Sequence, residues 1–231
     1  KGKSLETLVY DYTRWDDMVD FIASEDKIWG EQAINMRILF NFNTNAIWIY
    51  KPDLSLLYSI NNLGYDEFKE RPLPQEAFNK LFMQKRFCHF FIDTPKGLME
   101  IRGATVHPTA DTERKTLPRG YFFAGCLWDK DYIRELSTLT KSTISIAPVI
   151  EKVPSISVQP ESGLITFSKI LNSWDNRPLR CLNVWSEYTS IKDFIRISKV
   201  IFSMLCAFAA LILILLSISF TYWVNRPLGL I

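Results

Sequence analysis

The sequence contains only two histidines, His89 and His107, as candidates for proton transfer or metal binding. Residues 87–93 alternate in the manner of a strand, which places His89 on the same face as Phe87 and Phe91. We therefore interpret His89 as a strand histidine beside an aromatic core rather than as a ligand or a catalytic base. His107 stands before a proline at the end of a predicted strand, where we expect it to be exposed. The chain has no phosphate-binding loop, zinc-protease or serine-hydrolase motif, so its residues give little support for an enzyme.

Acidic side chains gather in the segment YDYTRWDDMVDFI, which starts at Tyr10 and contains Asp11, Asp16, Asp17 and Asp20. Carboxylates bind hard metal ions, but the side chains of consecutive helical residues diverge by about 100°. We expect these acids to be solvated or to cap a helix, and we expect neither a metal nor a cofactor.

The four cysteines, Cys88, Cys126, Cys181 and Cys206, include no Cys-x-x-Cys pair, which is the spacing typical of zinc modules and thiol redox sites. Cys206 lies within an apolar run, which leaves three cysteines for the rest of the chain. An odd number does not favour a disulfide framework, although one disulfide bridge between two of them is still compatible with the sequence. The net charge of +2 provides no electrostatic footprint for a nucleic-acid partner.

Candidate ligand-binding positions are polar or aromatic side chains on the predicted strands, namely Trp48, Tyr58, His89, Arg102 and Tyr121. Arg102 is the first candidate for contact with an anionic ligand, because a guanidinium group pairs with a carboxylate through two hydrogen bonds. The alternative is an arginine on a strand surface, surrounded by solvent.

The elements that position these residues follow from the apolar pattern. In the first forty residues, apolar side chains recur every three or four positions, which predicts a long N-terminal helix; they are Leu5, Leu8, Tyr12, Trp15, Val19 and Ile22. This seam packs either against its own sheet or in a parallel homodimer. Strands are predicted at 45–50, 54–60, 87–93, 97–107, 119–128, 142–150, 163–171 and 178–186, with helices at 73–83 and 129–141. The mixed order predicts an α+β domain with a mostly antiparallel sheet.

A segment near the carboxyl end predicts a membrane helix. Residues 200–224 carry no charge, and a helix of this length exceeds the roughly 30 Å hydrocarbon core. Tyr222 and Trp223 stand at its end, as in an aromatic belt, and a buried core helix is the alternative. Three basic residues, at 192, 196 and 199, precede the segment, but large domains translocate largely regardless of charge. Charge alone therefore leaves the orientation open.

The motif formed by Asp11, Trp15, Asp16 and Asp17 resembles the opening of the type-four CHASE (CHASE4) domain, an extracellular sensory domain. The predicted hairpin at 45–60 and the strand GYFFAGCLW agree, whereas TVHPTA keeps only the proline of the family's apolar-Pro-Ile motif. The resemblance covers about residues 5–195 and implies a PAS-like sheet with helices packed on it. It also implies that Tyr12 and Trp15 face the core or a partner, and that Asp11 and Asp16 accept hydrogen bonds from a loop backbone or an arginine.

The last residues, NRPLGLI, resemble the start of a HAMP linker through Arg226, Pro227, Leu228 and Ile231. The predicted organisation is a sensory domain at 1–198, a transmembrane helix at 199–224 and a truncated cytoplasmic HAMP linker at 225–231.

These resemblances together imply a prokaryotic receptor in the inner or plasma membrane, with a periplasmic or extracellular sensory domain. The expected output, on a part of the protein outside this sequence, is a histidine kinase of a two-component system or a cyclic di-GMP enzyme. Expected partners are the lipid bilayer, an unknown small-molecule or protein signal, and a second copy of the chain. A membrane-anchored assembly protein and a membrane-anchored enzyme are the alternatives.

Overall fold

The computed structural model describes residues 2–64, 73–83, 85–149, 156–159 and 163–220. The chain divides into two compact units. The first contains residues 1–153 and 168–183, and the second contains residues 154–167 and 184–231.

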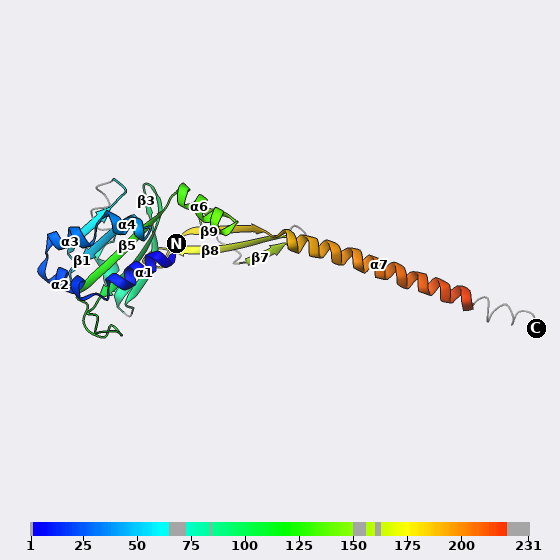
Figure 1. Cartoon of the computed structure of the whole chain (residues 1–231), viewed down its shortest axis with the longest axis horizontal. Helices are drawn as coiled ribbons and strands as arrows, with labels where there is room; N and C mark the ends of the chain where they lie inside the picture. Colours follow the sequence, from blue (N-terminus) through cyan, green and yellow to red (C-terminus); the bar gives the residue numbers. More distant parts are fainter. Residues whose placement is uncertain (1, 65–72, 84, 150–155, 160–162, 221–231) are drawn as a thin grey trace, which may run out of the picture. The chain divides into compact units, whose positions relative to one another are not determined.

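The first unit is built on a five-stranded sheet in which every pair with a described register is antiparallel. The strand order is β2-β1-β5-β4-β3, and Figure 1 labels β1, β5 and β3 of this sheet. The bounds are Ala46–Tyr50 for β1, Leu56–Asn61 for β2, Phe87–Thr94 for β3, Gly97–Val106 for β4 and Gly120–Trp128 for β5. The predicted α+β class is confirmed, because these hairpin-linked strands pair antiparallel and carry helices on both faces.

The N-terminal region differs from the predicted long helix, because it forms four short helices. They are α1 (Gly2–Tyr12), α2 (Asp16–Ser24), α3 (Lys27–Ala33) and α4 (Met36–Asn41). Trp15 has an extended backbone before α2, and Glu25 after it adopts the left-handed conformation, with φ of 56°. The Asp26 carboxylate then caps α3 by accepting hydrogen bonds from the amides of Ile28 and Trp29.

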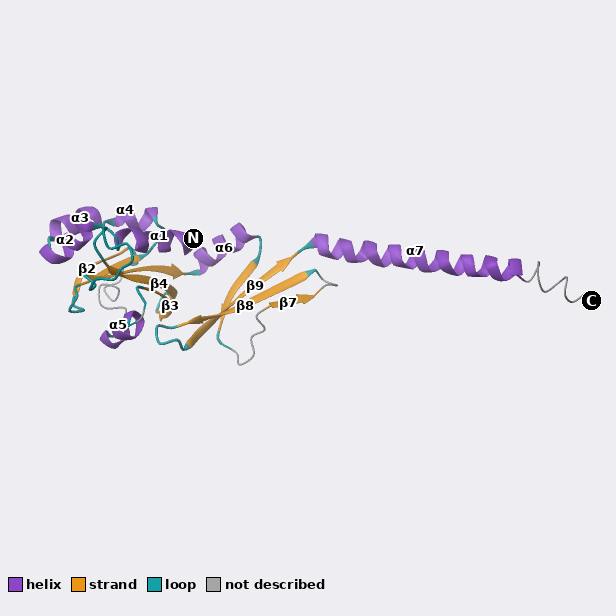
Figure 2. Cartoon of the chain, turned by 90° about the horizontal axis from the view of Figure 1, so that it is seen from below, coloured by secondary structure: helices purple, strands orange, loops and turns teal. Residues whose placement is uncertain are grey.

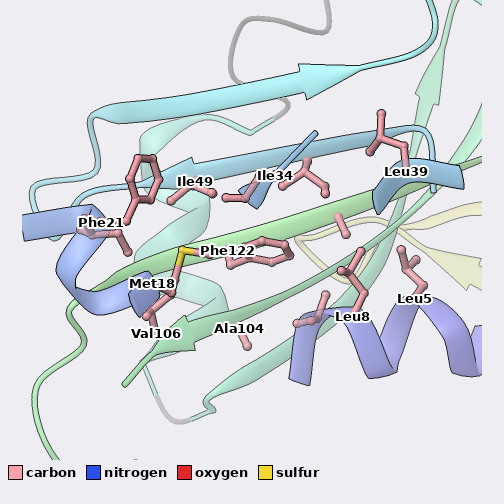
Figure 3. Close-up of a cluster of buried hydrophobic side chains, with 14 of the residues drawn as sticks. Leu5, Leu8, Met18, Phe21, Ile34, Leu39, Ile49, Ala104, Val106 and Phe122 are labelled. Atoms are coloured by element: carbon pink, nitrogen blue, oxygen red, sulfur yellow. The ribbon is translucent and has the colours of Figure 1, made fainter. Parts of the chain in front are cut away.

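The hydrophobic core occupies both faces of the five-stranded sheet, because alternate strand residues point to opposite sides. Helices α1–α4 cover one face and α5 (Gln75–Phe82) covers the other (Figure 2). Leu5 and Leu8 of α1 are almost completely buried and point at the sheet, as Figure 3 shows. The N-terminal apolar seam therefore packs against its own sheet.

Four further strands form a second sheet, where the sequence predicted only one. Its order is β6-β9-β8-β7, with bounds Thr143–Ala147 for β6, Ile156–Gln159 for β7, Leu164–Asn172 for β8 and Pro178–Glu187 for β9. Strand β7 was not predicted, because its four residues are too few to establish an alternating pattern. Helix α6 (Lys130–Thr140) precedes this sheet, and Asp129 caps it by accepting a hydrogen bond from the Tyr132 amide.

The last described element is α7 (Thr189–Phe220), a continuous helix of 32 residues. Its segment Asp193–Ser219 is long and apolar enough to cross a membrane, and none of its most apolar window is buried. The alternative of a buried core helix is therefore not supported. Residues 221–231, which include Tyr222, Trp223, Arg226, Pro227, Leu228 and Ile231, lie outside the described residues.

The four cysteines, Cys88, Cys126, Cys181 and Cys206, are all free thiols. Cys88 is mostly buried, and burial raises the pKa of its thiol to about 12. A disulfide bridge, which the sequence left open, does not form among them.

Candidate ligand-binding site

The buried carboxylate of Glu100 is hydrogen-bonded to the polar side chains around it on strands β3, β4 and β5. Glu100 is 4 % exposed and accepts three hydrogen bonds. The donors are His89 Nε2 at 2.9 Å, Arg102 Nε at 3.1 Å and Trp128 Nε1 at 3.2 Å. The strand register brings them together, because His89 lies directly opposite Arg102 and Glu100 lies two residues earlier on the same face.

The environment of Glu100 keeps its carboxylate ionised. Burial opposes ionisation, but the hydrogen bonds and charges of His89 and Arg102 outweigh it and hold the pKa of Glu100 below its ordinary value. A buried carboxylate with three donors is satisfied in its hydrogen bonding, so it does not protonate near neutral pH.

Arg102 is shared between two carboxylates. Its Nε bonds Glu100, and its Nη1 donates to Glu6 Oε2 of α1 at 2.9 Å. The Glu6 side chain is 65 % exposed, whereas the Arg102 side chain is only 22 % exposed. Arg102 is thus a half-buried link between α1 and β4, and not a strand arginine surrounded by solvent.

A cavity of about 920 Å³ lies beside this cluster, wholly within the first unit. Five segments line it: α1, the end of α5 with Met83 and Lys85 after it, strand β3, strand β4 through Arg102, and the turn between β8 and β9. His89 and Arg102 both reach its wall. The volume lies within the range of small-molecule sites, which is roughly 300–1,000 Å³.

The other predicted ligand positions lie elsewhere. Trp48 is completely buried in the core beneath α5. The Tyr58 hydroxyl donates a hydrogen bond to the Ile34 carbonyl at 2.9 Å. Tyr121 packs its ring against Phe78 and Phe82, with centroids 5.4 and 5.2 Å away. These three residues support the core and do not line the cavity beside β3.

The acidic motif holds a loop against the N-terminal helices. Asp16 accepts a hydrogen bond from the Thr109 amide at 2.8 Å, as expected of an acid that pairs with a loop backbone. Trp15 packs against the core, with ring centroids 5.5 Å from Tyr12 and 5.3 Å from Trp29. Asp11 and Asp17 are exposed.

His107 was expected to be exposed, and this expectation is wrong because the loop after β4 folds back over it. Its ring is completely buried, with Nε2 2.9 Å from Thr105 Oγ1 and Nδ1 3.1 Å from Asp111 Oδ2. Asp111 in turn accepts hydrogen bonds from the amides of Lys115 and Thr116. Burial lowers the pKa of His107, and the nearby charge of Arg114 lowers it further.

Sequence reasoning also missed Arg114, because one arginine in a polar loop carries no signal of burial. It is 4 % exposed, donates to the Thr13 hydroxyl at 2.7 Å and to the Thr105 carbonyl, and lies 4.4 Å above the Phe87 ring. Burial lowers the pKa of Arg114 to about 10. This side chain ties the end of α1 to strands β3 and β4.

The CHASE4 domain model matches residues 1–147. The structure is similar to the periplasmic domain of LuxQ from Vibrio cholerae, with 11% sequence identity, a TM-score of 0.44, and coverage of 81% of this chain and 90% of that one. It is also similar to the periplasmic domain of RsbU from Chlamydia trachomatis, with 12% identity, a TM-score of 0.33, and coverage of 74% and 78%. No curated protein matches the sequence.

Proposed function

Because the chain belongs to the CHASE4 domain family, we propose that it is the extracytoplasmic sensory domain of a transmembrane signalling receptor. The observation that carries this proposal is the family match over residues 1–147, followed in the same chain by a helix of membrane-spanning length and composition. A sensory domain needs such an anchor to act on a partner across the bilayer.

The chain also supports a direct route from the sensory domain to the membrane. Only Tyr188 separates the end of β9 from the start of α7. Its amide donates a hydrogen bond to the Gly163 carbonyl, just before β8, at 2.9 Å. A displacement of β9 would therefore move the first turn of α7. A signal molecule would shift the equilibrium between two positions of β9 and α7 only to the extent that it binds one of them more tightly than the other.

The cytoplasmic output belongs to the same proposal. Residues 225–231 resemble the start of a HAMP linker, which supports a histidine kinase, a diguanylate cyclase or a phosphodiesterase as the output. The receptor would act as a homodimer in the inner or plasma membrane of a prokaryote.

The cavity favours the sensor over the alternative of a membrane-anchored assembly protein. An assembly protein needs an exposed apolar patch but no cavity of ligand size, whereas the cavity beside β3 measures about 920 Å³.

Orientation in the membrane tests the proposal. Leu117 is 85 % exposed, so in intact cells a membrane-impermeant maleimide should label Leu117→Cys. Ile231→Cys should be labelled only after the membrane is permeabilised, and the parent chain supplies the background of the native cysteines. Labelling of both positions from the same side would refute the receptor topology.

A further inference from the structure

We propose that the cavity beside β3 binds a small carboxylate with an aromatic body, and that the bound carboxylate replaces Glu6 on Arg102. The inference deepens the proposed sensory function, on which its signalling role rests. Binding itself depends only on the cavity.

The charges on the cavity wall favour an anion. Lys80, Lys85 and Arg102 line it, against the carboxylates of Glu6 and Asp175. Asp175 already pairs with Arg177, so its charge is compensated. Among the described residues, Glu6 and the buried Glu100 share Arg102, and Lys80 and Lys85 add two further cations to the wall. A cationic ligand would meet these cations without a matching counter-charge, whereas an anionic ligand would be attracted.

The apolar part of the wall favours an aromatic body. Tyr10 and Phe87 are stacked there with ring centroids 6.2 Å apart, and they are 46 % and 43 % exposed. Trp174 lies on the opposing turn, with Lys80 Nζ 5.7 Å from its ring. Exposed aromatic rings beside fixed cations suit a ligand that is apolar at one end and negative at the other.

Glu6 is the carboxylate that a ligand can replace. Glu100 is buried and accepts from three donors, so its removal would leave the N–H groups of His89, Arg102 and Trp128 without this acceptor. Glu6 is 65 % exposed, and exposed ion pairs contribute little. Replacement would break the Glu6–Arg102 ion pair, which is one link between α1 and β4, while Leu5 and Leu8 keep α1 packed on the sheet. Ligand binding would therefore be communicated to α1.

Binding of para-fluorophenylacetate to the full chain in lipid nanodiscs, followed by fluorine NMR, tests this inference. Saturable binding at millimolar concentration is expected for para-fluorophenylacetate and not for para-fluorophenethylamine, which has the same ring and the opposite charge. Arg102→Gln should weaken binding about 10-fold or more, because it removes a charge-assisted pair. Glu6→Gln should instead tighten binding about 2- to 5-fold, because an exposed competing ion pair is lost.

The Glu6 variant is decisive, because its exposed side chain can be changed without loss of the fold. Glu25 provides the matched control, since it forms an exposed ion pair with Lys51 at 3.0 Å, and Glu25→Gln should leave the affinity unchanged. Absence of saturable binding, equal binding of para-fluorophenethylamine, or unchanged or weakened binding in Glu6→Gln would each overturn the inference. Since the orientation experiment uses no ligand, either proposal can fail without the other.

Discussion

Replacement of Glu100 by glutamine should destabilise the sensory domain strongly. The substitution keeps the shape of the side chain but exchanges one acceptor oxygen for an NH₂ group. In the native protein, Oε1 accepts from His89 and Arg102, and Oε2 accepts from Trp128. Either orientation of the glutamine amide leaves at least one of these donors facing another donor.

The expected magnitude follows from two losses. A buried donor without an acceptor costs about 1–3 kcal/mol, and the change from a charged to a neutral acceptor weakens each remaining bond by about 1 kcal/mol. With one of the three donors unmatched and two bonds weakened, we expect the free energy of unfolding to fall by about 3–5 kcal/mol in Glu100→Gln.

Urea unfolding of the chain in lipid nanodiscs, followed by tryptophan fluorescence, measures this change. Glu25→Gln is the matched control, because Glu25 pairs with Lys51 at the surface and its loss should cost less than about 1 kcal/mol. The indole N–H resonance of Trp128 should also move in Glu100→Gln and not in the control. A loss of stability no larger than that of the control would refute the assignment of Glu100 as a buried, fully paired carboxylate.

Three further predictions concern pH and the packing of the N-terminal helices. The pKa of Glu100 in the folded protein is lowered from 4.5. Its ionised carboxylate therefore stabilises the folded state fully above pH 4.5, and this stabilisation is lost as the pH falls through the folded pKa. In acid unfolding titrations, the difference in stability between the wild type and Glu100→Gln should shrink accordingly. Thr13→Val should cost about 1–3 kcal/mol in urea unfolding, because the buried Arg114 loses an acceptor, and equal costs for Thr13→Val and Thr13→Ser would contradict this. Asp16→Ala should lower the melting temperature more than Asp17→Ala, because only Asp16 has a described hydrogen bond to a loop amide; equal effects would argue against that bond.

Most of the sheet could be predicted from the sequence, because strand alternation is a property of neighbouring residues. The predicted strands at 87–93 and 97–107 differ from β3 and β4 by one residue. The membrane helix was also predictable, since transfer into lipid depends on composition and length. The acidic motif identified the family from four positions near the N-terminus.

The break after α1 could not be predicted, because the spacing of Leu5, Leu8, Tyr12 and Trp15 suits an uninterrupted helix equally well. The tertiary structure supplies what ends it. The Thr13 carbonyl accepts a hydrogen bond from the His107 amide at 3.0 Å, and its hydroxyl accepts one from Arg114. Both partners lie far along the chain and reach Thr13 only after the sheet has formed.

In the candidate ligand-binding site, too, some features could be predicted from the sequence and others only from the tertiary structure. The sequence placed His89 and Arg102 on two predicted strands joined by a turn, and the register of the structure sets them directly opposite each other. Only the tertiary structure decided that Glu100 is buried between them and that Glu6 of α1 reaches Arg102. These contacts depend on the burial of α1 against the sheet. That burial is set by packing between residues far apart in the chain and by the cost of desolvating charged groups, and neither can be inferred from neighbouring residues alone.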